Sequence, residues 1–384
     1  MASQHMNVTL VEQYSTGHHT EYLLHVISEF KGSNVSIHFV GCPQLCHLLK
    51  GKVASASPVT LDSQGHFIQR EYNKVKFIKE VFSLAKQQKS DLVHFVYIDR
   101  LIRALYCMKH NCNVPVVATL HWAYMLSEFN TSIGRKLSGK VERFLLNRLF
   151  KKGLKLITHS PKVAKAFNQL KAYSAYALNY PIAHHYTYTE QGRQKVRQAL
   201  NINKNDKLLL CFGGTRADKG ADVAVEALNQ LPDEYHLLIA GQEQDYSYDY
   251  LNNIACLGQK EQQLHFVKEF IPDEEVANIF SAADIVLLPY KENFAGQSGP
   301  LTIAASIGVP LLSSDVGVLR ETIDKYHLGV CVSHFRAHEM MTALNSLDIK
   351  LKYRDNTFLT ESSVHSFSMK TVKVYNACLV NSEN

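Results

Sequence analysis

Short runs of β-branched and aromatic residues alternate along the chain with longer stretches in which apolar residues recur at helical spacing. In the first half, amphipathic stretches follow the apolar runs VTLVEQY, NVSIHFVG, DLVHFVYI and VPVVATLH. This alternation of strand and helix patterns predicts βαβ units around a parallel sheet. Ligands of such sheets bind outside the carboxyl ends of the strands, so we expect functional residues directly after strands.

A second series with the same rhythm begins after Pro181 and the polar stretch 182–195. Its predicted strands include KLLLCFGG, YHLLIAG, DIVLLPY and VPLLSSD. The pattern predicts an α/β chain of two Rossmann-like, doubly wound domains that face a central cleft, at residues 7–183 and 184–384. The last helix could instead pack back on the first domain.

The composition is that of a globular enzyme. The chain has 384 residues, of which 46% are hydrophobic and 20% are charged, enough for two cores. No apolar run reaches the length of a membrane span and no secretory pattern opens the sequence, so we expect a cytoplasmic protein. The eight cysteines lack C-x-x-C spacing and no D-x-D motif occurs, so we expect reduced thiols, no cofactor and no essential metal.

The formal net charge of +6 favours an anionic partner: a nucleotide, a membrane surface or a nucleic acid. Nucleic acid is disfavoured because no motif interleaves aromatic and basic residues. In the segment 134–155, apolar residues such as Phe144 and Leu149 interrupt a run of Lys and Arg. Either this is a surface helix that buries one apolar stripe, or it lies peripherally on the anionic inner face of a membrane.

The segment CFGGTRADKGAD, from Cys211 to Asp222, runs from a strand through glycines and cations into a helix. Gly213 and Gly214 allow close backbone approach, and Arg216 and Lys219 are suited to neutralising a diphosphate. Taken alone, the same residues could be solvated loop charges around a turn. Neither a Walker loop nor a G-x-G-x-x-G after the first strand is present, which disfavours a kinase or an NAD enzyme.

This segment resembles the G-x-x-x-x-K-G element of the retaining glycosyltransferases of family 4, which have the GT-B fold. Further motifs follow in the order of that family: LLIAGQ, FIPDEEVANIFSAADIVLLPY, IAASIGVP and SSDVGVLRETI, preceded in the first half by STGHHTEYL, DLVHF, VVATLHW and LITHSPKV. The resemblance covers roughly residues 7–333. It implies that Arg216 and Lys219 stabilise the leaving diphosphate of a nucleotide sugar, with Thr215 and Phe270 also at the donor.

The family usually carries two glutamates in its donor motif, and this sequence keeps only the first, Glu292, while Ile303 stands in the place of the second. By resemblance Glu292 bonds the donor sugar; the alternative is an exposed loop acid. The segment resembles a family variant with Gln-Ser-Gly before a helix. Its helix start is expected to hold the donor phosphates, and the residues concerned are Gln297, Ser298, Gly299, Pro300, Leu301 and Thr302.

On the first domain, His121 directly follows the strand VPVVATL and matches the histidine of the family's T-x-H segment, near the transferred sugar. The alternative for His121 is a structural role. Gly17 lies in the loop after the first strand, which is expected to approach the same sugar.

The resemblance therefore implies a retaining transferase that moves a sugar from a UDP- or GDP-linked donor to a glycan or glycolipid acceptor. The expected setting is cell-surface polysaccharide or lipopolysaccharide synthesis. The alternatives are a nucleotide-sugar epimerase, a phosphorylase or a non-enzymatic sugar-binding protein of the same architecture. The sequence leaves the base, the sugar and the acceptor open.

Overall fold

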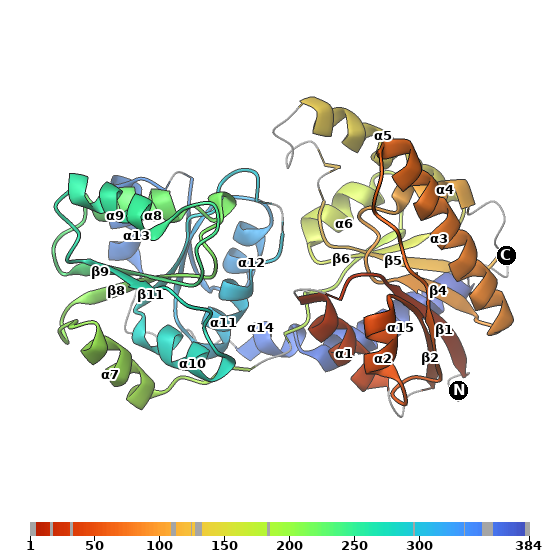
Figure 1. Ribbon diagram of the computed structural model, residues 1–384, viewed down its shortest axis with the longest axis horizontal. Coiled ribbons are helices and arrows are strands. Elements are labelled where there is room, and N and C mark those ends of the chain that lie inside the picture. The colour runs from red at the N-terminus through yellow and green to blue at the C-terminus, as the bar shows by residue number, and fades with distance from the viewer. Residues whose placement is uncertain are drawn as a thin grey trace. The chain divides into compact units, whose positions relative to one another are not determined.

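The computed structural model describes residues 5–15, 18–30, 34–108, 113–123, 125–126, 133–182, 185–294, 296–333, 335–347 and 356–380. The chain forms two compact units. The N-terminal unit consists of Met1–Ala183 and Glu361–Asn384, and the C-terminal unit consists of His184–Thr360. Each unit is a parallel sheet covered by helices, as Figure 1 shows.

Within the described residues, the N-terminal unit has a seven-stranded sheet of order β3-β2-β1-β4-β5-β6-β7, in which every pair is parallel. The strands are β1 (Met6–Glu12), β2 (Val35–Gly41), β3 (Ser55–Pro58), β4 (Leu92–Phe95), β5 (Val116–Leu120), β6 (Lys155–Thr158) and β7 (Ala175–Ala177). The helices are α1 (His18–Phe30), α2 (Pro43–Leu49), α3 (Phe67–Gln87), α4 (Ile102–Met108), α5 (Ile133–Lys151), α6 (Pro161–Asn168) and α15 (Val364–Val380).

The helices of this unit cover both faces of the sheet. Leu10 and Val117 of the sheet share one buried cluster with side chains of α1, α2 and α15. Phe167 of α6 instead packs against Phe150 of α5. Strands covered on both sides can be apolar throughout, and β4 and β5 are buried along their whole length.

The C-terminal unit has a six-stranded parallel sheet of order β10-β9-β8-β11-β12-β13. Its strands are β8 (Lys207–Phe212), β9 (Tyr235–Ala240), β10 (Leu264–Val267), β11 (Ile285–Leu288), β12 (Leu311–Ser314) and β13 (Gly329–Val332). Its helices are α7 (Glu190–Ala199), the 3₁₀ helix η3 (Ala217–Lys219), α8 (Ala221–Leu228), α9 (Tyr248–Leu257), α10 (Asp273–Ala282), α11 (Gly299–Ile307), α12 (Leu319–Lys325) and α13 (Ala337–Ser346). Helix α14 (Asn356–Glu361) then leads back to the N-terminal unit.

The polar stretch 182–195, interpreted from the sequence as the boundary between domains, contains the start of helix α7. The Thr189 hydroxyl caps α7 by accepting the Gly192 N–H. Arg193 and Arg197 of α7 both bind the Asp284 carboxylate, at 2.7 and 3.1 Å, just before β11. A helix this polar therefore docks through ion pairs rather than through an apolar stripe, which explains why its sequence looked like a linker.

Both sheets have a switch point, where successive connections leave in opposite directions. It lies between β1 and β4 in the N-terminal unit and between β8 and β11 in the C-terminal unit. Ligands of doubly wound sheets bind in the crevice at this point. The strand order therefore marks one candidate site in each unit.

Helix α15 is attached to the N-terminal sheet by a buried polar contact. Nδ1 of His94, on β4, lies 2.7 Å from the Tyr375 hydroxyl of α15, and Nε2 lies 2.9 Å from the Thr119 hydroxyl of β5. Burial lowers the pKa of His94 from 6.5 to about 3. The ring is thus held neutral by its surroundings, and protonating it would oppose folding.

We expect His94→Gln to flatten the dependence of stability on pH. The pKa of His94 is depressed in the folded state, so its contribution is complete above about pH 6.5 and is lost as the pH falls toward 3. The loss is at most about 1.4 kcal/mol per pH unit. Urea denaturation at pH 7 and pH 4.5 measures it, with the exposed His47→Gln as control. The proposal fails if His94→Gln and His47→Gln lose the same stability between these pH values.

Candidate functional site

The loop after β8 is shaped by two glycines with left-handed backbone angles. Gly213 has a φ of 103° and Gly220 a φ of 68°. A Cβ atom on Gly220 would lie 1.9 Å from the Pro289 carbonyl oxygen, so only glycine lets this loop approach the end of β11. The sequence GGTRADKG therefore folds as a turn followed by η3 at the switch point of the sheet.

Thr215 braces this loop against the segment after β9. Its hydroxyl donates to the Tyr246 carbonyl at 2.5 Å and accepts the Gln244 N–H at 2.9 Å. Its backbone N–H donates to the Gln242 carbonyl, and its own carbonyl accepts the Tyr246 N–H. Thr215 is buried, and through these contacts it holds the loop in its conformation.

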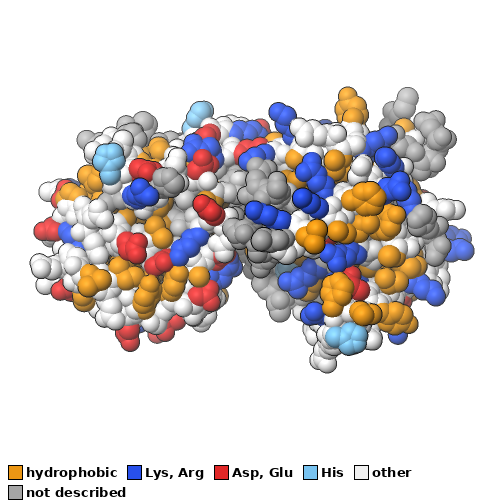
Figure 2. Space-filling model, turned by 90° about the horizontal axis from the view of Figure 1, so that it is seen from above, with side chains coloured by type: hydrophobic (Ala, Val, Ile, Leu, Met, Phe, Trp, Pro, Cys, Tyr) orange, Lys and Arg blue, Asp and Glu red, His pale blue; other side chains and the backbone are white. Residues whose placement is uncertain are grey.

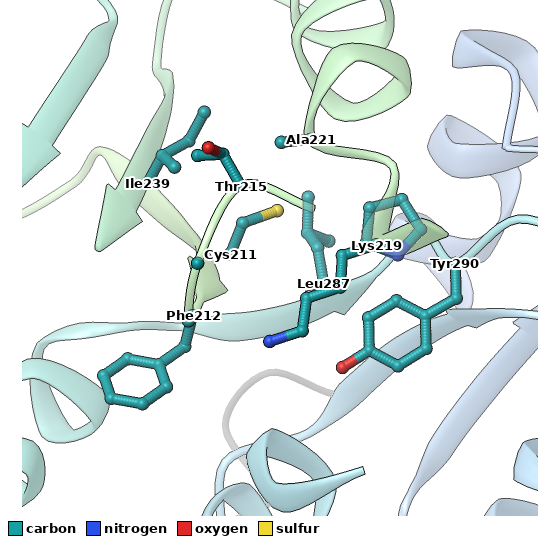
Figure 3. A pocket seen from close by; sticks show the side chains of 11 residues that line it. Cys211, Phe212, Thr215, Lys219, Ala221, Ile239, Leu287 and Tyr290 are labelled. Atoms are coloured by element: carbon teal, nitrogen blue, oxygen red, sulfur yellow. The ribbon is translucent and has the colours of Figure 1, made fainter. Parts of the chain in front are cut away.

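Lys219 reaches back over the glycine turn. A Cβ atom on Gly213 would lie only 2.4 Å from the Lys219 ammonium nitrogen. Burial lowers the pKa of Lys219, and the nearby Arg216 guanidinium lowers it further. Figure 3 shows the Lys219 ammonium and the Tyr290 hydroxyl pointing toward the same side of the pocket, which also includes Cys211 and Leu287.

This pocket encloses about 20 Å³. A space of this size holds roughly one water molecule. A diphosphate would therefore bind at the mouth of the pocket, with the Lys219 ammonium beneath it, rather than inside.

Arg216 forms a two-point ion pair with Asp218, two residues along the chain. Nε and Nη2 of Arg216 lie 2.9 and 2.6 Å from the two carboxylate oxygens. These hydrogen bonds raise the pKa of Arg216. The Arg216 side chain is 41% exposed, so the guanidinium is oriented from one edge and stays accessible to solvent.

Tyr290 connects this loop to helix α11. Its hydroxyl lies 3.0 Å from the Ser298 hydroxyl. Ser298 is the N-cap of α11 and accepts the Leu301 N–H. Burial raises the pKa of Tyr290, so the phenol stays protonated. The cations of the β8 loop and the start of α11 therefore share one wall of the site.

The start of α11 offers fewer free amides than the sequence suggested. The Leu301 N–H is bonded to the Ser298 hydroxyl and the Thr302 N–H to the Ser298 carbonyl. Pro300 has no N–H. Among these residues the structure records no acceptor for the Gly299 N–H, so Gly299 is the amide available to an anion. Gln297 is half-buried beside it.

Other predicted donor residues lie at the surface. Glu292 is exposed in the turn after β11, and no hydrogen bond or ion pair within the described chain involves it. Phe270 is 73% exposed in the segment before α10 and does not line the pocket. Ile303 lies on α11 with its side chain half-buried. The structure therefore groups Arg216 and Lys219 closely and leaves Glu292 and Phe270 apart from the pocket.

In the N-terminal unit, His121 stands directly after β5 and is buried. Its Nε2 lies 3.0 Å from the Val96 carbonyl oxygen, which can only accept, so Nε2 carries the proton of the neutral ring. Asp99 accepts the backbone N–H groups of His121 and Trp122, at 3.2 and 2.5 Å. Burial raises the pKa of Asp99 to about 7, although these two N–H groups oppose the shift.

His121 belongs to a cluster of rings at the carboxyl ends of β4, β5 and β6. The Tyr97 ring stacks on it at 4.9 Å between centroids, and the His159 ring is also 4.9 Å away. The His19 ring also lies 4.8 Å from that of Tyr97, and its Nδ1 lies 3.3 Å from the carboxylate of Glu12, the last residue of β1. Gly17, predicted to approach the sugar, lies outside the described residues.

Sequence reasoning missed several residues of these two clusters. They are Glu12, Tyr97, Asp99, His159, Asp218 and Tyr290. Glu12, Tyr97, His159 and Tyr290 lie at or just after the end of a strand, the position the parallel fold marks for ligands. That positional signal was available. The Arg216–Asp218 pair was not predictable, because it depends on the turn of η3.

The described residues hold no group of three or more His, Cys, Asp or Glu side chains arranged to bind a metal ion. Over the same part of the chain, no helix has both the length and the apolarity needed to cross a membrane.

Comparison with known proteins finds a family match in the C-terminal unit. Residues 192–356 match the family described as Glycosyl transferases group 1. The lipopolysaccharide glucosyltransferase WaaG of Escherichia coli K12 is 26% identical over 181 residues. That match covers 44% of this chain and 46% of WaaG, so the chain spans less than half the length of this curated relative.

Solved structures match the whole fold. A glycosyltransferase from Rickettsia africae has a TM-score of 0.71 at 15% identity, over 97% of this chain and 98% of that one. HepE from Anabaena, solved with UDP, has a TM-score of 0.72 at 16% identity, over 97% of this chain and all of that one. The structure of WaaG matches with a TM-score of 0.60 at 16% identity, over 96% and 99% of the two chains.

The predicted fold class is confirmed: the chain has the two-domain fold of the GT-B glycosyltransferase structures. Residues 192–356 of its C-terminal unit match the Glycosyl transferases group 1 family, which agrees with the predicted enzyme class.

Proposed function

We propose that the chain is a retaining glycosyltransferase of family 4 that transfers a sugar from a UDP- or GDP-linked donor to a glycan or glycolipid acceptor. The proposed setting is cell-surface polysaccharide or lipopolysaccharide synthesis, at the cytoplasmic side of a membrane and without a cofactor or essential metal. The partial match to WaaG, a lipopolysaccharide glucosyltransferase, and the fold shared with the UDP-bound HepE support this choice.

The observation that carries the proposal is the grouping of Lys219 and Arg216 at the switch point of the matched domain, with Tyr290 linking the pocket to Ser298 at the start of α11. As the bond from sugar to phosphate breaks, negative charge grows on the departing diphosphate. Fixed cations in a partly desolvated site stabilise this charge more than water does. Lys219 is placed beneath the phosphates, and Arg216 presents its Nη1 edge, since Asp218 takes Nε and Nη2.

Retention of the anomeric configuration is part of the proposal and rests on the resemblance to the retaining transferases of family 4. The pocket agrees with it, since none of the described residues that line it is an Asp or Glu. We infer that the acceptor hydroxyl attacks the face that the diphosphate leaves. An oxygen of the departing phosphate takes the hydroxyl proton, and the anomeric configuration is retained.

The N-terminal unit supplies the acceptor side in this proposal. Tyr97 is half-buried at the carboxyl end of β4 and stacks on the buried His121 ring, and Asp99 holds the backbone of His121 in place. Glu292 remains the proposed ligand of the donor sugar and is exposed for that role.

Arg216→Ala is expected to lower kcat/KM for the nucleotide sugar roughly a hundredfold, because one donor to the developing charge is lost. A panel of UDP-, GDP- and ADP-sugars in thermal-shift measurements identifies the donor. The rate is then measured as the formation of product in the presence of the acceptor, and NMR of the product gives its anomeric configuration. Arg320→Ala is a matched control, since Arg320 is also 41% exposed and is paired with Asp315.

An Arg216→Ala enzyme as fast as the wild type would remove Arg216 from the mechanism. Hydrolysis of the donor without transfer to any acceptor would contradict the transferase itself. An inverted product would contradict retention only.

Gly213→Ala should weaken nucleoside-diphosphate binding roughly tenfold, about 1.4 kcal/mol. The new Cβ would displace the Lys219 ammonium, and the φ of 103° would be strained. Gly51→Ala is the matched control, because its φ of 77° is also strained but its Cβ would meet no atom within 4 Å and it lies on the N-terminal unit. Calorimetric titration with UDP and GDP measures the affinity. Equal affinities of the two variants would show that the position of Lys219 does not depend on Gly213.

The membrane interpretation of the segment 134–155 also remains a proposal, supported by an exposed stripe on α5. Leu137 and Phe144 are 66% and 57% exposed, with Val141 between them. Lys136 and Lys140 are exposed on the same helix. Figure 2 shows hydrophobic and basic side chains intermingled on this face of the N-terminal unit. An anionic leaflet would fit both.

The variant Leu137→Ser with Phe144→Ser should lose most of its binding to vesicles that contain phosphatidylglycerol at low salt, because the apolar anchor is removed. Cosedimentation measures the bound fraction. Leu257→Ser is the control, since Leu257 is 86% exposed but lies on the C-terminal unit. The membrane interpretation is abandoned if the wild-type protein is not retained by these vesicles.

A further inference from the structure

We propose that a groove at the open edge of the N-terminal sheet binds a single-chain amphiphile with an anionic head group. The groove lies along β7, between α6 and α15, and has a volume of about 680 Å³. Small-molecule sites typically measure about 300 to 1,000 Å³. The proposal concerns the N-terminal unit alone and does not require that the chain transfer a sugar.

The floor of the groove is hydrocarbon. Ala164 of α6, Ala175 of β7 and Val374 of α15 line it with small or branched side chains, and Leu178 and Tyr176 extend it. Burial raises the pKa of the Tyr176 phenol, which stays neutral. When such a surface covers an alkyl chain, the free energy falls in proportion to the apolar area removed from water.

The rim of the groove is cationic. Lys165 of α6 and Lys373 of α15 are exposed, and the structure records no ion pair for either within the described residues. Lys370 contributes a third ammonium, whose contact is the Glu361 carbonyl oxygen at 3.5 Å. The sequences of α6, β7 and α15 contain no Asp or Glu at all. The uncompensated charge selects an anionic head group.

The backbone of β7 argues against an added peptide strand as the occupant. Asn168 already bonds both outward-facing groups of Ala175: its amide donates to the carbonyl at 2.8 Å and its oxygen accepts the N–H at 2.9 Å. The same oxygen accepts the Ser174 N–H. β7 has only three residues, so little of its edge remains for strand pairing. A ligand that needs no backbone partners fits better.

The test is calorimetric titration of the full chain with dodecyl phosphate below its micelle concentration. We expect saturable binding of one molecule per chain, with dodecyl maltoside and inorganic phosphate each binding roughly tenfold or more weakly. Lys165→Gln with Lys373→Gln should weaken dodecyl phosphate binding to a similar extent. The control is Lys79→Gln with Lys86→Gln, two exposed lysines of α3 outside the groove.

Ala177→Trp provides a second test, because Ala177 is exposed on the rim and an indole would fill the groove. It should abolish binding of dodecyl phosphate, with an unchanged unfolding transition. If that variant misfolds, the double lysine variant still decides. The proposal is overturned by non-saturable binding, by equal binding of dodecyl maltoside, or by undiminished binding in the lysine variant.

Two further measurements separate this site from the others. If the lysine variant loses binding to phosphatidylglycerol vesicles but not to dodecyl phosphate, the groove is a membrane contact and the amphiphile proposal is overturned. Nucleotide-sugar thermal shifts should be unchanged in every groove variant. If the wild-type protein binds dodecyl phosphate but no nucleotide sugar, the proposed transferase is contradicted and the proposal for the groove stands.

Discussion

Both units depend on one constraint: every strand of each sheet runs in the same direction. Parallel strands need crossover helices, and these helices cover both faces of the sheet, so polar groups are displaced to the sheet's ends. The carboxyl ends then meet along one edge, and the change of winding direction between β8 and β11, or between β1 and β4, opens a crevice there. The two candidate clusters follow from this topology before any side-chain chemistry is considered.

At the carboxyl edge of the C-terminal sheet, cations are partly buried with no fixed counterion on the side where the ligand would bind. The free-energy cost of this burial is divided between two residues. Arg216 is held by Asp218 along one edge of its fork and is 41% exposed, so part of its hydration is kept. Lys219 is more buried, and its pKa is lowered by that burial and by Arg216. In the proposed function, a bound diphosphate would relieve the cost of burying Lys219.

The sequence predicted what depends on local periodicity and on short motifs. The parallel sheets, the glycine turn and the cation pair at Arg216 and Lys219 all carry such signals. The sequence did not predict helix α7, because its docking rests on ion pairs with Asp284 that lie about ninety residues away along the chain. The edge strand β10 was missed for a related reason: Leu264 is its one fully buried residue, so the apolar run is too weak to recognise.

The two clusters also differ in how far they could be anticipated, and the reason is chemical. The C-terminal cluster uses backbone and two cations close together in sequence, so eight consecutive residues from Gly213 to Gly220 nearly define it. The N-terminal cluster is assembled from Glu12, Tyr97, His121 and His159, each at the end of a different strand.

The motifs VVATLHW and LITHSPKV contain His121 and His159, but they do not show that these residues are neighbours, because the residues meet only when the sheet has formed. That difference matches the work proposed for each. A phosphate can be held by any dense set of donors and positive charges, whereas sugars differ mainly in the direction of their hydroxyl groups, which hydrogen-bonding side chains held at fixed positions can discriminate. Specificity for the acceptor is therefore expected to depend on contacts that form only in the folded sheet.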